Sequence, residues 1–149
     1  MKTIEHSAYL DYSAEQMYRL ANDVAHYSEF LPWCAATKVI SESETAMTAS
    51  ITVKKGPVEQ SFTTDNTLDK NAAIHMQLRD GPFKTMTGQW TFKPLSDTAC
   101  KASFTLQFEF ESKLLALALS PLFEKIANTM IDAFVARAGE VYSEAGLSR

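Results

Sequence analysis

Cysteine is scarce in this sequence, and long apolar runs and signal-peptide features are absent from it. The two cysteines, Cys34 and Cys100, fit no metal-binding or redox spacing, so we expect reduced thiols in the protein core. No apolar run reaches the ~18 residues that a membrane-spanning helix requires. The first ten residues contain no apolar signal-peptide segment. These absences predict a cytoplasmic protein without a membrane span.

Excess positive charge is absent too, since the formal net charge is −4. Broad nucleic-acid binding needs a clustered basic surface, so this balance argues against a DNA-binding protein. It leaves room for a local basic patch, for which the hints are Lys38, Lys54, Lys55 and Lys84. The chain has no repeat, low-complexity tract or linker, and its length predicts one domain over residues 1–149.

The longest periodic segment is the last one, from about Leu114 to Tyr142. Its apolar residues recur every three or four positions, as on one face of a helix. They are Leu122, Phe123, Ile126, Ala127, Met130, Ile131, Phe134, Ala138, Val141 and Tyr142. Ser120 and Pro121 suit a helix cap and a first-turn proline. Residues 113–119 therefore form a separate turn, or the helix kinks at this point.

Most of the preceding sequence alternates apolar and polar residues, as strands with one buried face do. The clearest case is residues 100–112, where one face carries Cys100, Ala102, Phe104, Leu106, Phe108 and Phe110. Further strands are expected over residues 3–10, 36–43, 45–53, 58–68, 72–78 and 84–93. A capping box at residues 13–16 opens a short helix, and a second short turn ends near Leu31.

These elements predict an α+β fold with two short helices after the first strand. Seven strands at about 4.8 Å spacing form a sheet about 29 Å wide. A helix of roughly 22 residues is about 33 Å long, so one helix matches the width of one sheet. We therefore expect a curved, seven-stranded antiparallel sheet wrapped around the long C-terminal helix.

Three stretches together resemble a known family. The first is residues 23–34, which include Pro32 and Trp33. The second is the turn Asp80-Gly81-Pro82-Phe83, followed by Gly88, Trp90 and Phe92. The third is residues 108–114, followed by Met130, Phe134, Arg137 and Tyr142. In this order they resemble the coenzyme Q-binding protein family of the START-like (polyketide cyclase and lipid transport) superfamily, over about residues 3–143. Within that family the chain is most similar to the bacterial ribosome association toxins.

The resemblance implies a helix-grip fold with a hydrophobic cavity and no required cofactor. It implies two roles: binding ubiquinone or another prenyl lipid, and binding the large (50S) ribosomal subunit so that 70S particles do not form. The periodicity shows neither role, and no ribosome-contact residues transfer. The sequence begins at Met1 without a targeting extension, so we do not expect the inner-membrane context of the mitochondrial relatives.

Eight inward-facing residues are the candidates to line the cavity: Phe62, Met76, Met86, Trp90, Phe104, Phe108, Met130 and Phe134. The competing interpretation is that they form an ordinary packed core. Polar candidates to orient a head group are Gln60, Thr64, Asn66 and His6, in the manner of ligand pockets. Arg137 is a further polar candidate, or else forms a salt bridge at the edge of the helix face.

The entrance is expected beside two family stretches, with Trp33 and Phe83 as a lid or as caps on the core; its residues are Pro32, Trp33, Asp80, Gly81, Pro82 and Phe83. An empty pocket of about 300 Å³ would destabilise the fold by roughly 7 kcal/mol, at about 24 cal/mol per Å³. We therefore expect the pocket to be partly collapsed, hydrated or occupied.

Catalysis would require a histidine or carboxylate inside the pocket. His75 is predicted to point outward, His26 lies on a surface-like helix, and His6 is ambiguous. The sequence shows no Ser/His/Asp or metal-ligand constellation. We therefore predict a non-enzymatic protein, with a polyketide cyclase-like enzyme acting on an aromatic or polyketide substrate as the alternative.

Overall fold

The structure is a computed structural model that describes residues 2–143. Residue 1 and residues 144–149 of the predicted domain lie outside the described residues. Within the described range, seven strands form one antiparallel sheet in the order β1-β7-β6-β5-β4-β3-β2. The strands are β1 (Lys2–Leu10), β2 (Cys34–Glu42), β3 (Ala46–Lys55), β4 (Val58–Asp69), β5 (Ala73–Asp80), β6 (Phe83–Ser96) and β7 (Ala99–Phe110).

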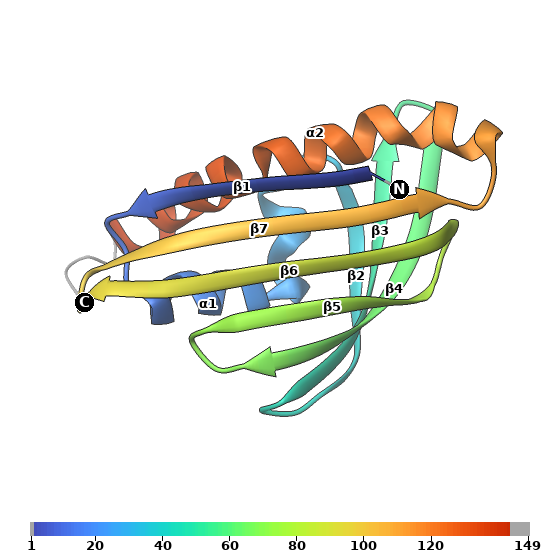
Figure 1. The fold of residues 1–149 in the computed structure, drawn as a ribbon. Coiled ribbons are helices and arrows are strands. Elements are labelled where there is room, and N and C mark those ends of the chain that lie inside the picture. Colours follow the sequence, from blue (N-terminus) through green and yellow to red (C-terminus); the bar gives the residue numbers. More distant parts are fainter. Residues whose placement is uncertain (1, 144–149) are drawn as a thin grey trace.

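Four helical segments accompany these strands within the described residues. Helix α1 (Ala14–Asn22) and the 3-10 helix η1 (Val24–Glu29) lie between β1 and β2, and α2 (Lys113–Ala138) follows β7 and continues into η2 (Gly139–Ser143). The sheet curves around α2, which runs alongside β1 and β7 (Figure 1). Helix α1 packs against α2, β6 and β7. This arrangement confirms the predicted α+β helix-grip fold.

The capping box predicted before α1 is present. Ser13 Oγ accepts a hydrogen bond from the Gln16 backbone N–H at 3.1 Å. The Gln16 side chain accepts one from the Ser13 backbone N–H at 2.9 Å. These two bonds satisfy backbone donors that have no partner within the helix, which fixes where α1 begins.

Several element boundaries differ from the sequence prediction, and the structure explains two of them. Helix α2 begins at Lys113, with Ser112 Oγ accepting from the Leu115 N–H at 3.1 Å, and it continues through Pro121. The predicted cap at Ser120 was therefore wrong. Strand β6 extends to Ser96 rather than ending at Lys93. The strand tolerates Pro94 because this residue lies opposite Cys100 beside a register shift, at the end of the pairing with β7.

By length and composition, α2 together with η2 (Lys113–Tyr142) could cross a membrane. Buried core helices pass the same test, and in this fold α2 turns one face toward the sheet. That face contributes Leu122, Phe123, Ile126, Ala127, Met130, Ile131 and Phe134 to the core. Packing of this face against the sheet therefore accounts for these apolar residues of the helix.

Candidate functional site

A small apolar cavity lies between the sheet and the helices, with a volume of about 60 Å³. Strands β3 to β7 form one wall, and α1, η1 and α2 form the other. The lining side chains are Ala21, Val24, Tyr27, Trp33, Ala49, Ile51, Phe62, Thr64, Asn66, Ile74, Met76, Met86, Trp90, Phe104, Leu106, Phe123, Ile126 and Met130. None of these residues is charged. The volume corresponds to the partly collapsed alternative rather than to an open pocket.

Six of the eight side chains predicted to line the cavity do so: Phe62, Met76, Met86, Trp90, Phe104 and Met130. The other two do not, and they lie in packed core instead. Phe108 belongs to an aromatic cluster with Phe83, Phe110 and Phe123. Phe134 is fully buried, with its ring 5.0 Å from that of Trp90 and 5.4 Å from that of Tyr27.

An aromatic wall on β6 and β7 bounds one side of the cavity. The register of the two strands pairs Trp90 with Phe104, and their ring centroids are 4.9 Å apart. Trp90 also stacks on Phe92 at 5.6 Å with an interplanar angle of 11°. Because side chains two apart on a strand share a face, strict alternation is enough to build this wall.

Methionines provide the adaptable part of the lining, at Met76, Met86 and Met130. Met76 lies opposite Gly88 on the neighbouring strand. A Cβ atom at Gly88 would be 2.7 Å from Met76 Cε, so the methionine occupies space that the glycine leaves open. Unbranched thioether side chains repack readily around irregular shapes. The cavity can therefore enlarge by movement of these side chains.

The polar side of the cavity consists of Thr64 and Asn66, which are neighbours on the inner face of β4. Thr64 Oγ1 donates to Asn66 Oδ1 at 2.7 Å. Among the described residues, these two are the polar or charged side chains that are buried, each 6% exposed. Gln60 is half-buried and does not line the cavity. His6 is exposed and bonds through Nε2 to Asn128 Oδ1 of α2 at 2.6 Å.

Sequence reasoning missed the contribution of the short helices to the lining. Ala21 of α1, and Val24 and Tyr27 of η1, all line the cavity. The Tyr27 hydroxyl donates to the Ala21 carbonyl oxygen, and burial raises the pKa of this phenol. The spacing of Val24 and Tyr27, three residues apart, is the sequence signal that they share one face of a 3-10 helix.

The predicted entrance residues divide into two groups. Trp33 is half-buried and lines the cavity, while Pro32 beside it is exposed. Phe83 is only 3% exposed and packs in the aromatic cluster, so it caps the core rather than forming an exposed lid. Asp80 is exposed, and Gly81 and Pro82 are half-buried. A Cβ atom at Gly81 would approach Phe62 Cβ to 2.7 Å, which explains the glycine in this turn.

Arg137 does not line the cavity. Its guanidinium pairs with Glu29 of η1 at 2.9 Å and lies 5.0 Å from the centre of the Phe30 ring. These contacts match the alternative in which Arg137 forms a salt bridge at the edge of the helix face. The pair links α2 to η1, which contributes Val24 and Tyr27 to the cavity lining.

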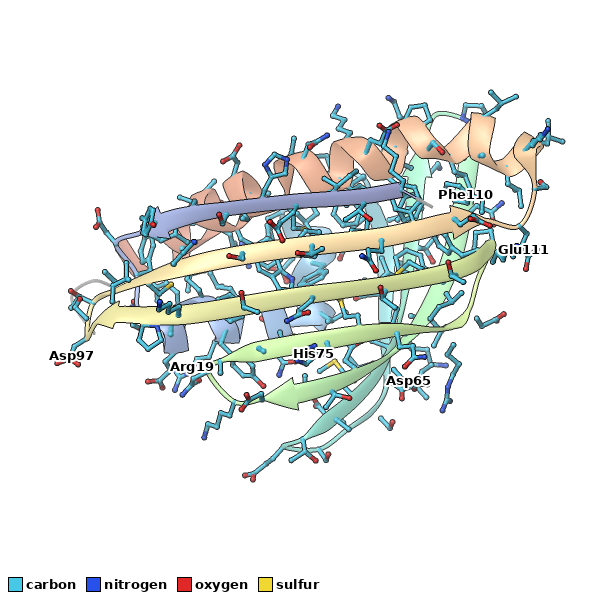
Figure 2. All side chains as sticks on the ribbon, in the orientation of Figure 1. Arg19, Asp65, His75, Asp97, Phe110 and Glu111 are labelled. Carbon is cyan, nitrogen blue, oxygen red and sulfur yellow. The ribbon has the colours of Figure 1, made fainter. Side chains whose placement is uncertain are left out.

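The outer face of the sheet carries polar side chains, including His75, which is exposed as predicted (Figure 2). Asp65 accepts hydrogen bonds from Thr48 at 2.7 Å and Arg79 at 3.0 Å, and these bonds hold the pKa of that carboxyl below its usual value.

Across residues 2–143, no group of three or more histidine, cysteine or acidic side chains could hold a metal ion. Cys34 and Cys100 are buried and free, and burial raises the pKa of both thiols.

Comparison with known proteins agrees with this architecture. Residues 10–135 match the family described as polyketide cyclase/dehydrase and lipid transport. The chain is 48% identical over 139 residues to the ribosome association toxin RatA of Pseudomonas aeruginosa, covering 93% of this chain and 96% of that protein. It is 33% identical to the mitochondrial coenzyme Q-binding protein COQ10 homolog B of Xenopus laevis, over 95% of this chain and 60% of that protein.

A solved structure shares the fold at much lower sequence identity. The Zhui aromatase/cyclase from Streptomyces sp. R1128 superposes with a TM-score of 0.81 at 16% identity, over 92% of this chain and 93% of that chain. The family match spans most of the sequence, and the relatives confirm the resemblance to ribosome association toxins and coenzyme Q-binding proteins. The chain therefore belongs to the polyketide cyclase/dehydrase and lipid transport family.

Proposed function

We propose that this protein binds a neutral hydrophobic molecule, a quinone or another prenyl lipid, in the cavity between the sheet and α2, and that it does so without catalysing a reaction. The observation that carries the proposal is the cavity lining. It combines many apolar and aromatic side chains with one small polar pair, which is the usual composition of a small-molecule site. The name of the COQ10 relative supports a coenzyme Q-like ligand.

The ligand enters by displacing side chains, because a cavity of about 60 Å³ holds only a few water molecules. At roughly 24 cal/mol per Å³, leaving this cavity empty destabilises the fold by about 1.4 kcal/mol. A prenyl tail recovers up to about 0.8 kcal/mol for each CH₂-sized group that it buries. The energy of tail burial thus favours an expanded, occupied cavity over the collapsed one.

The lining supports a binding role over a cyclase role. General acid–base chemistry needs a titratable group that reaches the substrate. Among the lining residues, the side chain that titrates is Tyr27, and its hydroxyl is already bonded to the Ala21 carbonyl with its pKa raised by burial. Incubating the protein with an aromatic polyketide substrate tests the alternative, and turnover above the uncatalysed rate would favour the enzyme.

Two measurements test the binding proposal. Organic extraction of the purified protein followed by mass spectrometry should release a stoichiometric prenyl lipid. A long-chain quinone at saturating concentration should raise the melting temperature, because binding to the folded state alone stabilises it. An unchanged melting temperature together with a lipid-free extract would refute the proposal.

A second candidate function is association with the large ribosomal subunit. Relatives with 46–48% identity over nearly the whole chain carry the name ribosome association toxin. Sucrose-gradient profiles of cells that overproduce the protein should then contain excess free 30S and 50S particles. Charge reversal at Lys54 and Lys55, which are exposed at the end of β3, should abolish the effect on free subunits, with charge reversal at the exposed Lys93 of β6 as the control.

A further inference from the structure

The polar pair on β4 is unusual for its position. Thr64 and Asn66 are the buried polar side chains among the described residues, and both face the same cavity. Their cross-strand neighbours are Ala49 and Leu78 for Thr64, and Met47 and Met76 for Asn66. Both polar side chains therefore have apolar neighbours on the adjacent strands. A buried polar group weakens a fold unless its hydrogen-bonding capacity is used.

We infer that Asn66 recognises the ligand by donating from its side-chain amide N–H to a carbonyl oxygen on an uncharged head group, with Thr64 as the positioning residue. This inference rests on the proposed ligand-binding function. It adds the chemical class of the head group and the residue that binds it.

The direction of donation follows from the hydrogen bond between the two residues. Thr64 Oγ1 donates to Asn66 Oδ1 at 2.7 Å, so the amide oxygen is already engaged. Thr64 is the hydrogen-bond partner that the structure gives to the Asn66 side chain among the described residues. The amide nitrogen carries two N–H donors and no acceptor lone pair. The group it presents to the cavity therefore requires an acceptor.

The neutrality of the head group follows from the rest of the lining. No lysine, arginine or histidine is among the lining residues that the structure describes. Arg137, the cationic cavity candidate from the sequence, is paired with Glu29 and does not line the cavity. A carboxylate such as that of a fatty acid would be buried without a counter-ion, which is strongly unfavourable. A quinone carbonyl or another ketone satisfies the amide N–H without introducing charge.

Binding of three probes with equal alkyl chains tests the inference on the full-length protein: a decyl-substituted benzoquinone, decylbenzene and undecanoate. Tryptophan fluorescence reports binding, because Trp33 and Trp90 both line the cavity. The quinone should bind at least tenfold more tightly than either of the other probes. Asn66→Leu should remove this preference for the quinone while leaving decylbenzene affinity unchanged. Thr64→Val should lower quinone affinity several-fold, and Thr67→Val, at an exposed position on the outer face of the same strand, is the matched control that should not.

A second readout needs no variant. Infrared difference spectra of a ¹³C-carbonyl-labelled quinone should show one carbonyl stretch shifted to lower frequency on binding to the wild-type protein. An unshifted stretch, or a quinone affinity that Asn66→Leu does not change, would overturn the role of Asn66 while the proposed function stands. Undecanoate binding as tight as quinone binding would overturn the neutral head group. If the wild-type protein binds none of the three probes, the proposed function fails and this inference fails with it.

Discussion

The interior of this protein has two regions that are built from the same strands but packed differently. Where β7 ends and α2 begins, Phe83, Phe108, Phe110 and Phe123 fill the space with ring contacts, including Phe83 stacked on Phe110 at 4.8 Å (Figure 2 labels Phe110 and Glu111 at this end). Further along the sheet, methionines and the Thr64–Asn66 pair leave a cavity of about 60 Å³. Rings packed on rings close the first region, whereas methionines and a short polar pair beside the aromatic wall keep the second region adjustable.

This contrast predicts where truncation will weaken the fold most. Phe108→Ala should lower the free energy of unfolding by about 3–5 kcal/mol, because the surrounding rings cannot collapse into the space left by the phenyl group. Phe62→Ala, in the cavity wall and already half-buried, should have a smaller effect. Urea denaturation of both variants measures the difference. Equal losses at the two positions would mean that the regions are equally well packed.

The polar pair should behave as a unit within the adjustable region. Thr64→Val alone should destabilise the protein by about 1–3 kcal/mol, because Asn66 Oδ1 loses its donor while it stays buried. Adding Asn66→Leu should recover most of that loss, since replacing both partners with apolar groups is nearly neutral. A double-mutant cycle of unfolding free energies checks this expectation. Additive losses would show that the two side chains are not coupled.

Gly88→Ala should separate ligand binding from stability. The new Cβ atom would meet Met76 Cε at 2.7 Å and push the end of the methionine toward the cavity. We expect a several-fold loss of quinone affinity with an unfolding free energy within about 1 kcal/mol of wild type, because only a flexible side chain must move. Thr87→Ala, on the outer face of the same strand, is the control. An affinity equal to that of the wild type would indicate that Met76 moves away from the cavity instead.

The smallest predicted effect concerns η1, which contributes Val24 and Tyr27 to the lining of the adjustable region. His26 Nδ1 lies 2.7 Å from Asp23 Oδ1, and this hydrogen bond, with the nearby charges of Asp23 and Glu29, raises the pKa of His26 above its usual 6.5. The resulting stabilisation is fully present below about pH 6.5 and is lost as the pH rises through the folded-state pKa. Urea midpoints of wild type and His26→Asn should therefore differ at about pH 6 and converge at about pH 8.5. A constant difference would contradict the assigned contact.

Strand alternation made the fold predictable, whereas the position of the cavity required three-dimensional information. The alternation from Cys100 to Phe110 identifies which face of β7 is buried. The alternation does not reveal where along that face a cavity remains. Phe104 and Phe108 share the buried face, but only Phe104 of the two lines the cavity. Tyr27 was missed as a lining residue because its placement depends on how η1 lies against the sheet. Ser120-Pro121 reads locally as a helix start, but the earlier cap at Ser112 determines where α2 begins.

Pro121 has a consequence for the dynamics of α2. A proline has no N–H, so the carbonyl of Leu117 lacks its usual helical hydrogen bond at this point. The turns before it leave Leu114 and Leu117 77% and 79% exposed, and Leu119 is the residue they bury. With this helical hydrogen bond missing and little packing to hold them, these turns can fray without disturbing the remainder of the helix. In deuterated water, the amides of residues 114–119 should therefore exchange long before those of residues 122–134.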